Sequence, residues 1–432
     1  MWPKPWGRRS TSDVSQFHEA AARTRQEDIM QPIQLSTRPA GRRTALLAVS
    51  LAAILGAGAA SCGDSTEPSP ESLEAGRDIF RFDTFGDEKF WTDTLRMHEV
   101  IQGGVTPAVA LSVGLNVDAD ALPQDLRDAL AAGQVDLNST ATTVALLKLG
   151  AVIGLEGDVQ TIDGRDTLVR VGTTCALCHS SVDNSFAPGI GRRMDGWANT
   201  QLDPGAIIAL SPALTAEQKA VYTSWGPGRY DPRYNIDGQN TPVVLPPAYG
   251  LDGVDRETFT GDGPVSYWNA YVAITQMHGQ GTFRDNRLGI DIVQSPDLVT
   301  PKLEALRDYQ LSLRAPAPAP GSFDPAAAQR GREVFTGAGR CASCHAGAIL
   351  SDINSGKRHA PEETGMDPRY AARTVEKAYR TTPLRGLLQH PPYFHDGSAA
   401  TLDDVVAQYE QVLELELTAG ERSDLVEYLK SL

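Results

Sequence analysis

Cys175-Ala176-Leu177-Cys178-His179 and Cys341-Ala342-Ser343-Cys344-His345 are the two stretches that decide how this chain folds. Each stretch places two thiols about one helical turn apart and follows the second thiol directly with an imidazole. The spacing is identical in both, and together they use four of the five cysteines. The fifth, Cys62, lies far upstream, so the sequence offers no separate pair of cysteines for a structural disulfide.

The pattern C-x-x-C-H is the attachment motif of c-type haem. Two thiols at this spacing reach two vinyl groups on one edge of a porphyrin, and the adjacent imidazole points at the iron. A redox dithiol would not need the following histidine, and a zinc site would need the two cysteine pairs to converge. We therefore expect two covalently bound haem c groups, with His179 and His345 as the proximal iron ligands. Each of these histidines should donate its other ring N–H to a carbonyl or a carboxylate.

The N-terminal region resembles an export signal. Residues 44–60 carry no charge, follow Arg38, Arg42 and Arg43, and precede small residues. This order of a basic, an apolar and a small-residue segment is typical of a secretory signal, and the apolar run is short for a spanning helix, which needs about 20 residues. The polar residues 1–29, which precede Met30, are excluded from the fold. We expect the mature protein outside the cytoplasm, in the periplasm or cell envelope.

Cys62 ends the stretch Ala59-Ala60-Ser61-Cys62, which resembles the lipidation site of bacterial lipoproteins. Lipoproteins usually have leucine where Ala59 stands, so two alternatives to a lipid anchor at Cys62 stay open. One is simple cleavage of the signal, and the other is an uncleaved anchor.

Charge argues against some partners. The chain has 39 Lys+Arg and 54 Asp+Glu, and without residues 1–62 it keeps 31 basic and 50 acidic residues, a net charge of −19. Such a surface disfavours nucleic acid and anionic membranes, which leaves a lipid anchor as the expected membrane contact. A redox protein is the expected partner.

The sequence around the two motifs repeats, which predicts a mostly α fold with two tandem class I-like cytochrome c domains. The order in both halves is an opening helix, the haem motif, a Thr-Pro loop, an Asp-Gly turn and a closing helix. The matching segments are 75–80 with 330–335, 241–263 with 382–397, and 306–313 with 425–432. We expect a signal or lipoprotein segment over 1–62, a tether over 63–73, domains over 74–314 and 325–432, and a Pro-rich linker over 315–324.

The first copy is longer than the second. Phe80 stands 95 residues before Cys175, whereas its counterpart Phe335 stands six residues before Cys341. Residues of about 81–170 are therefore an insertion, for which the apolar periodicity at 126–131 and 144–149 predicts helices. The insertion would either cover the first haem or dock against the second domain.

The second half, over residues 326–432, resembles the C-terminal domain of bacterial di-haem cytochrome c peroxidases. It is equally similar to the di-haem enzymes that mature the tryptophan-derived cofactor of methylamine dehydrogenase. The residues that carry the resemblance are Thr382-Pro383-Leu384-Arg385 and the run from Pro392 through Phe394-His395-Asp396-Gly397 to Leu402. The resemblance implies haems close enough to exchange electrons. It also implies a calcium site between the domains, but no residue pattern of this chain shows where that site lies.

The resemblance also implies where the sixth ligand of the second haem lies. In these families it is a methionine or a tyrosine on the helix after the Asp-Gly turn, and the aligned residue is Tyr409. A packing tyrosine is the alternative, and Met366 is a weaker candidate. His395 is expected to form a hydrogen bond, and His359 and His390 to lie in loops.

For the first haem, the repeat aligns the Tyr409 region with Met277 and His278, either of which would close the iron into a six-coordinate state. His98, on a predicted helical face of the insertion, is the competing candidate. The alternative for Met277 is a place in the core.

The choice between enzyme and electron carrier depends on an acid/base group, because a peroxidase must move a proton between peroxide oxygens. The resembling peroxidases use a glutamate beside the first haem, but the corresponding run from Pro264 to Gly281 has neither Glu nor Asp. Their inter-haem tryptophan is also missing, because the turn reads Phe259-Thr260-Gly261-Asp262-Gly263 here. Trp225 or Trp268 could substitute, although buried tryptophans usually serve packing.

We therefore expect a di-haem electron-transfer cytochrome without an assigned catalytic residue. The alternative is a peroxidase-like oxidoreductase acting on hydrogen peroxide, with Glu99 or Asp262 as the distal group. A third interpretation is a redox sensor or an assembly subunit.

Overall fold

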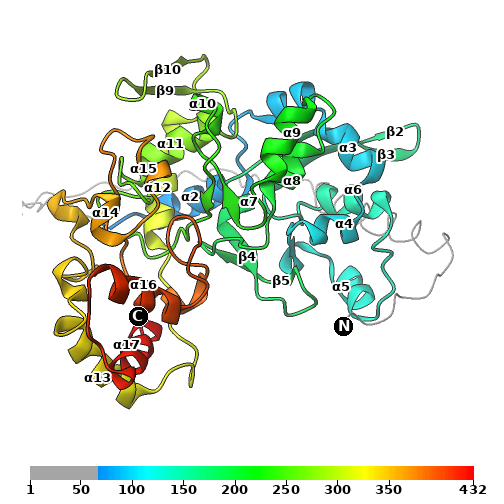
Figure 1. Cartoon of the computed structure of the whole chain (residues 1–432). Coiled ribbons are helices and arrows are strands. Elements are labelled where there is room, and N and C mark those ends of the chain that lie inside the picture. Colours follow the sequence, from blue (N-terminus) through cyan, green and yellow to red (C-terminus); the bar gives the residue numbers. More distant parts are fainter. Residues whose placement is uncertain (1–66) are drawn as a thin grey trace, which may run out of the picture. The chain divides into compact units, whose positions relative to one another are not determined.

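Two helix pairs of the same kind frame the part of the chain that the computed structural model describes, residues 67–432. Helix α2 (Pro70–Phe82) packs against α12 (Leu303–Ser312), and α13 (Pro325–Thr336) packs against α17 (Ala419–Lys430) (Figure 1). The opening and closing segments of the predicted repeat are thus in contact in each half. The predicted signal segment and Cys62 lie outside the described residues.

Each pair crosses at a glycine. A Cβ atom on Gly76 would lie 2.0 Å from the carbonyl oxygen of Ala305, and one on Gly331 would lie 1.9 Å from that of Asp424. Only a residue without a side chain allows this approach. The same aromatic contact follows in both pairs, with ring centroids 5.6 Å apart for Phe80–Tyr309 and 5.2 Å apart for Phe335–Tyr428. The two pairs are therefore built alike in their backbone approach and in their aromatic contact.

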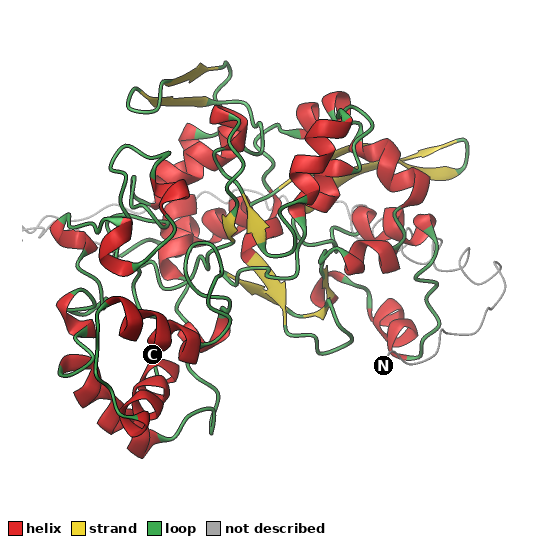
Figure 2. Ribbon diagram, in the orientation of Figure 1, coloured by secondary structure: helices red, strands yellow, loops and turns green. Residues whose placement is uncertain are grey.

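Helices dominate the rest of the fold, and the strands are short (Figure 2). The other α-helices are α3 (Met97–Gly104), α4 (Pro107–Ser112), α5 (Gln124–Ala131), α6 (Thr140–Lys148), α7 (Ala176–His179), α8 (Pro204–Ala209), α9 (Ala216–Thr223), α10 (Tyr234–Asp237), α11 (Val265–Thr275), α14 (Pro361–Thr364), α15 (Pro368–Ala371) and α16 (Leu402–Val412). Single turns of other helix types are η1 (Lys89–Thr94), η2 (Ala119–Ala121), η3 (Thr300–Lys302), η4 (Cys341–Ser343), η5 (Ile353–Ser355) and η6 (Leu387–Gln389).

The strands form small two-stranded sheets. The pairs are β1 (Val117–Asp118) with β5 (Ile190–Gly191), β2 (Leu155–Ile162) with β3 (Arg165–Thr173), β4 (Ser180–Val182) with β6 (Arg193–Asp195), β7 (Arg229–Tyr230) with β8 (Val243–Val244), and β9 (Thr282–Asp285) with β10 (Ile290–Val293). The β1–β5 pair is parallel and the other four are antiparallel.

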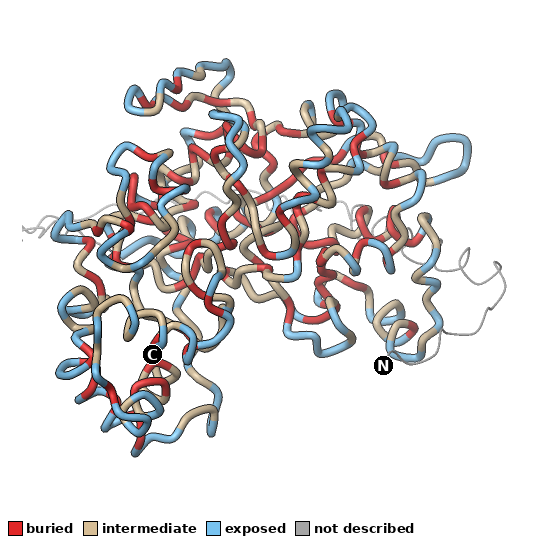
Figure 3. The backbone as a smooth tube through the Cα atoms, in the orientation of Figure 1, coloured by how far each residue is buried: buried red, intermediate tan, exposed pale blue. Residues whose placement is uncertain are grey.

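The insertion is only partly helical, which corrects the prediction of a helical insertion. Helices α5 and α6 lie where the apolar periodicity placed them, but β2 and β3 form an antiparallel hairpin. Its turn is Asp163-Gly164, both with positive φ (51° and 76°), which is the geometry that Asp-Gly favours in two-residue hairpins. The tip of this hairpin is exposed (Figure 3).

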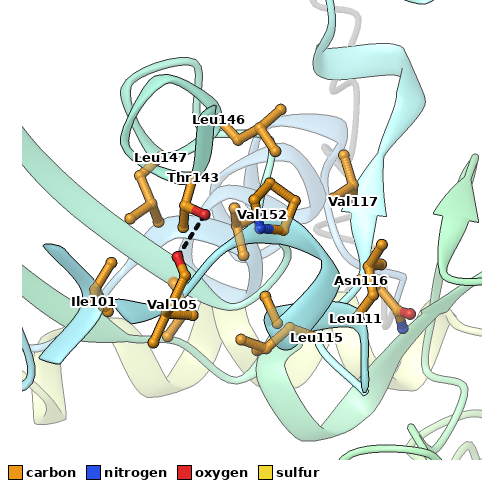
Figure 4. A pocket seen from close by; sticks show the side chains of 13 residues that line it. Ile101, Val105, Leu111, Leu115, Asn116, Val117, Thr143, Leu146, Leu147 and Val152 are labelled. Atoms are coloured by element: carbon orange, nitrogen blue, oxygen red, sulfur yellow. Dashed lines mark hydrogen bonds between the residues drawn. The ribbon is translucent and has the colours of Figure 1, made fainter. Parts of the chain in front are cut away.

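The insertion builds its own apolar core from α3, α6, β2 and β3. A small cavity lies among α3, α4, α6, β1 and β2 and is lined almost wholly by aliphatic side chains (Figure 4). Thr143 in its wall is hydrogen-bonded, because its Oγ1 donates to the Val105 carbonyl at 2.7 Å. Val105 and Leu155 also pack on the cluster that contains Leu177 and Cys178. The insertion therefore packs on the first C-x-x-C-H motif.

Residues Pro70–Leu432 form one compact unit. The predicted domain borders around residues 315–324 stay a prediction. No helix within residues 67–432 combines the length and the apolar character that a membrane crossing needs.

The glycine crossings predict a specific effect on stability. Replacing Gly331 with alanine should lower the free energy of unfolding by about 1–3 kcal/mol, because the helices must move apart or distort. Gly420→Ala is the matched control on α17, since the added Cβ has only Thr418 Oγ1 nearby, at 3.9 Å. Chemical denaturation of both variants measures the difference, and equal stabilities would contradict the crossing.

Candidate functional site

The first motif is held from behind by the end of the insertion. The Thr174 N–H donates to the Gly154 carbonyl at 3.0 Å, and the Leu177 N–H donates to the Thr174 carbonyl at 3.1 Å. Gly154 has a φ of +84°, and a Cβ on it would lie 2.2 Å from the Leu177 Cα. Only glycine suits this combination of positive φ and close approach. The insertion therefore fixes the backbone from which the thiols and the imidazole project.

His179 is oriented by a backbone carbonyl. Its Nδ1 lies 3.1 Å from the Pro246 carbonyl oxygen, which can only accept, so Nδ1 carries the proton. Burial lowers the pKa of His179, which favours the neutral imidazole. The ring nitrogen that remains to ligate a metal is Nε2.

His345 in the second motif repeats this arrangement. Its Nδ1 lies 3.0 Å from the Leu350 carbonyl oxygen, and burial lowers the pKa of its imidazole. The predicted hydrogen bond to a carbonyl is thus present in both motifs. The second motif differs in exposure, because Ser343 and Ala346 are exposed whereas Ala176 and Ser180 are fully buried.

The four thiols of the motifs are free cysteines. Burial raises the pKa of Cys175 and of Cys178 to about 12 and that of Cys341 to about 11. Protonated thiols in apolar surroundings are poor thiolate ligands for zinc and poor nucleophiles. The two motifs also pack on different core clusters, so the pairs do not converge on one ion. In each of the two motifs, unpaired thiols beside a neutral imidazole fit a covalently attached haem.

Tyr409 lies close to the second motif. Burial raises its pKa to about 12, and the nearby thiols of Cys341 and Cys344 raise it further in the same direction. Its ring contacts Phe394, with centroids 5.9 Å apart. The structure therefore places Tyr409, the predicted sixth ligand, near the second motif. Because its pKa is raised, its hydroxyl would lose the proton only if a cation lay beside it.

The candidates for the first haem lie in different surroundings. Met277 is buried in the same core as Cys175, and its carbonyl accepts from Trp91 Nε1 at 3.1 Å. His278 stacks on Phe90 with ring centroids 3.7 Å apart, and burial lowers its pKa. Helix α3, which carries His98, packs on a core that contains no residue of either motif, and His98 Nδ1 is buried without a partner in the described chain.

No sequence pattern singles out two polar residues that lie near the first motif. Tyr230 packs on the cluster that contains Cys178, and burial raises its pKa well above the ordinary value. Its hydroxyl donates to Gln276 Oε1 at 3.1 Å, and Gln276 is buried. Gln276 stands next to Met277, but Tyr230 lies 46 residues away, so only the fold reveals the pair.

The two suggested distal acids are held by arginines. Asp262 is buried and pairs with Arg233 at 2.8 Å. Glu99 is exposed on α3 and pairs with Arg96 at 2.6 Å, which lowers the pKa of its carboxyl group. A carboxyl group that is engaged by an arginine is less free to exchange a proton with a bound peroxide.

Trp225 and Trp268 are both buried, and each indole N–H has an acceptor. Trp225 Nε1 donates to Asn240 Oδ1 at 2.8 Å, and Trp268 Nε1 donates to the Glu257 carbonyl at 3.1 Å. Their contacts are those of packing residues.

The remaining candidates make ordinary side-chain contacts. His395 Nε2 lies 3.0 Å from the Tyr379 hydroxyl, in line with the expected hydrogen-bonding role. Met366 packs on the cluster that contains Tyr379, and His390 contacts Tyr393. His359 lies between two carboxylates, Asp352 and Glu363, at 3.1 Å from each.

Carboxylates that lie between the two halves are paired with arginines. Arg373 pairs with Asp231 and Asp237, each at 2.8 Å, and Arg380 pairs with Glu257 at 3.2 Å. These carboxylates are neutralised by guanidinium groups. In residues 67–432, the group of metal-ligating side chains that lies close enough together is Cys344, Asp352 and His359, beside the second motif. The calcium ion between the domains that the resemblance implied therefore stays a prediction.

Comparison with known proteins bears on the two motifs. Cytochrome-c peroxidase IdrP1 of Denitromonas iodatirespirans is 30% identical over 151 residues, which are 25% of this chain and 40% of that protein. Methylamine utilization protein MauG of Methylorubrum extorquens is 30% identical over 129 residues, 24% of this chain and 34% of that protein. The chain is a relative of the di-haem cytochrome c peroxidases and of MauG. This confirms the resemblance that the sequence indicated. The matching segments span two fifths or less of the length of these relatives.

Other comparisons add little to this relation. No protein-family model matches the chain. A solved MauG-like protein associated with microbial copper homeostasis is 18% identical, with a TM-score of 0.32 over 45% of this chain and 74% of that chain. A likeness at this level carries no argument about the fold.

A buried carboxylate behind the first motif predicts a pH dependence of stability. Asp87 accepts from the Thr173 N–H at 3.1 Å and is fully buried, and burial raises its pKa to about 8. Between its unfolded value near pH 4 and pH 8 the folded state binds the extra proton, so stability falls as pH rises, by at most about 1.4 kcal/mol per pH unit.

Asp87→Asn should remove this contribution. Urea denaturation of wild type and variant from pH 5 to pH 8 should show a difference in stability that changes with pH. A constant difference would mean that Asp87 is ionised throughout this range in the folded protein.

Proposed function

We propose that the chain is a di-haem c-type cytochrome that transfers electrons outside the cytoplasm. Two tandem class I-like cytochrome c domains, over 74–314 and 325–432, would be joined by the Pro-rich segment 315–324. The observation that carries the proposal is the repeated arrangement in each half. Free thiols stand beside a histidine whose Nδ1 donates to a backbone carbonyl, and a glycine-crossed helix pair frames the half.

In this function Cys175, Cys178, Cys341 and Cys344 form the thioether links, and His179 and His345 ligate the irons. A bound haem c supplies a one-electron couple to each site. The Pro246 and Leu350 carbonyls hold the imidazoles in one tautomer and orientation, which directs Nε2 to the metal. The apolar surroundings of the thiols limit access of water to the sites.

The sixth positions separate the two haems. Tyr409 is the proposed ligand of the second iron, because it lies beside Cys341 and Cys344. Met277 is the proposed ligand of the first iron, since it shares a core with Cys175, and His278 and His98 are the alternatives.

The names of the relatives favour a second candidate, a peroxidase-like oxidoreductase acting on hydrogen peroxide. The acids that the sequence suggested for it are engaged, Asp262 with Arg233 and Glu99 with Arg96. The polar pair Tyr230 and Gln276 near Cys178 would then be the distal groups. Neither side chain supplies a carboxylate, so electron transfer is the function that the geometry supports better.

The proposed location is the periplasm or cell envelope, and the proposed partner is a redox protein. Two sequence-based proposals support this location: an export signal over residues 44–60 and a lipid anchor at Cys62. A calcium ion between the domains, which the resemblance implied, is a further part of the proposal, although the carboxylates there are paired with arginines.

Mass spectrometry tests the proposal. Protein matured in a host that exports and attaches c-type haem should carry the mass of two haems. Replacing Cys175 and Cys178 with serine should remove one of them, and replacing Cys341 and Cys344 should remove the other. Protein without added macrocycle mass at either motif would refute the proposed function.

The ligand assignments make a separate prediction. Tyr409→Phe should change the ferric spectrum of the second haem alone, and Met277→Leu should change that of the first alone, because each removes one axial bond. Optical and EPR spectra of the wild type should show two low-spin haems inert to peroxide. A high-spin haem that turns over peroxide with an electron donor would favour the peroxidase.

A further inference from the structure

Three metal-ligating side chains meet beside the second motif. They are Cys344, Asp352 and His359, called the ligand group here. The Cys344 Sγ, one carboxylate oxygen of Asp352 and one ring nitrogen of His359 all lie within 4.8 Å of one another. In residues 67–432 this is the set of three such side chains that lies close enough together to hold one ion, so the first motif has no counterpart in that part of the chain.

The backbone holds Asp352 and His359 in place. The His359 N–H donates to the Tyr379 carbonyl at 2.8 Å, and the Tyr379 N–H donates back to the His359 carbonyl at 2.9 Å. Asp352 follows Ser351, whose side chain donates to the Thr381 carbonyl at 2.6 Å. His359, Ser351 and Tyr379 are buried. Both ligand candidates therefore project from a fixed backbone, which is what a preorganised site requires.

Asp352 uses its carboxylate in an unusual way. It stands at the N-terminal end of η5, but its side chain does not cap that turn, although aspartate at such a position commonly does. Its Oδ2 instead lies 3.1 Å from the His359 Nε2, and its Oδ1 is buried without a hydrogen-bond partner in the described chain. The carboxylate thus faces the imidazole and keeps one acceptor atom unused.

The imidazole of His359 faces a carboxylate on each side. Its Nδ1 lies 3.1 Å from Glu363 Oε2, and its Nε2 lies 3.1 Å from Asp352 Oδ2. A neutral imidazole has one N–H and can donate to only one of them, so at the other nitrogen two lone pairs face each other. A second proton on the ring removes this repulsion, and so does a metal ion bound to Nε2. With the metal ion, Nδ1–H donates to Glu363, which is the carboxylate–histidine–metal arrangement common in metal sites.

The position of Cys344 favours the metal ion over the second proton. A second proton would engage Asp352 Oδ2 alone, whereas a metal ion would take ligands from the thiolate, the carboxylate and the imidazole together. Sulfur, oxygen and nitrogen ligands in one site suit a borderline divalent ion such as Zn²⁺, which binds three protein ligands and leaves a fourth position open. Calcium takes about six to eight oxygen ligands, so this group does not suit it.

The ligand group can be reached from solvent. Ser343 and Ala346, which flank Cys344 and His345 in the chain, are both exposed. An ion can therefore enter without opening the fold. The exposed side chain of Lys357 has its Nζ 3.4 Å from the Asp352 Oδ2, so its ammonium competes with a bound cation for that carboxylate.

We propose that Cys344, Asp352 and His359 bind a divalent metal ion of the zinc class in the chain before haem is attached at the second motif. The Cys344 thiol releases its proton when the metal binds, and no electron is transferred. A sulfur in a thioether link has no thiolate to offer, so the metal and the haem exclude each other at the second motif. This exclusion rests on the proposed function, whereas the metal site itself does not.

The zinc affinity of the haem-free chain tests the site. The whole chain is produced in the cytoplasm of a host without haem attachment, with Cys62, Cys175 and Cys178 replaced by serine so that the remaining thiols are those of the second motif. It is titrated with Zn²⁺ in competition with a chromogenic chelator, and with Co²⁺ as a spectroscopic probe.

The chain should bind one zinc ion. Asp352→Ala and His359→Gln should each lower the zinc affinity by about tenfold or more, because each removes one of three ligands. The Co²⁺ form should show a thiolate-to-metal charge-transfer band that Cys344→Ser removes. Zinc binding that is equally strong without Asp352 and His359, as an unfolded chain would show, would overturn the proposal.

A variant on the surface tests the site without touching its ligands. Lys357→Ala should raise the zinc affinity by about twofold to fivefold, because the competing ammonium is gone. Lys430→Ala is the matched control, since it releases Glu427 on α17 instead, and it should leave the zinc affinity unchanged. A zinc affinity that Lys357→Ala does not change would contradict the role of Asp352 as a ligand.

Mass spectrometry tests the exclusion. Protein exported and matured with zinc in the medium should carry less haem at the second motif and unchanged haem at the first, and His359→Gln should carry both haems with or without zinc. Equal haem at the second motif of the wild type under both conditions would overturn the exclusion. Absence of haem from both motifs without zinc would refute the proposed function instead, and the zinc affinity of the haem-free chain would stand.

Discussion

The direct backbone contact between opening and closing helices is the constraint on which the rest of this structure depends. At Gly76 and Gly331 the helix partner's carbonyl oxygen lies where any other residue would have its Cβ. Close approach brings Phe80 onto Tyr309 and Phe335 onto Tyr428, and these rings belong to the two cores on which Cys175 and Cys341 pack. The helices contribute no ligand, but they determine the shape of the space in which each motif lies.

Within that frame, the two motifs are alike in chemistry and different in environment. In both, a backbone carbonyl fixes the imidazole, and burial favours its neutral form. The first motif is enclosed by the insertion, where Gly154 allows the chain to pass within contact distance of Leu177. The second motif has no such cover, and Ser343 and Ala346 face solvent. This difference would make the second site the more accessible one for a partner protein.

Arginines form ion pairs between the two halves. Arg373 and Arg380 reach across to buried carboxylates, and removal of one partner from such a pair typically costs about 3–5 kcal/mol. The same region holds Tyr249, whose hydroxyl donates to the Gly386 carbonyl.

The sequence by itself determined the chemistry that is written in local patterns. The two C-x-x-C-H motifs, the repeat of opening and closing helices and the alignment of Tyr409 all depend on spacing along the chain, and spacing can be read without a structure. The kinship with cytochrome c peroxidases and MauG followed from the local run around Phe394-His395-Asp396-Gly397. Even the overlooked hairpin of the insertion had a local signal, because Asp163-Gly164 favours a tight turn.

Only the tertiary structure decided which distant groups meet. Pro246 and Leu350 as partners of the imidazoles, Tyr230 beside Cys178, and the arginines that engage Asp262 and Glu257 involve contacts that no periodicity encodes. The ring contact between Tyr249 and His390 is of the same kind. The physical reason is that such contacts arise from how packed helices and loops fill space, and packing depends on all elements together rather than on any one segment.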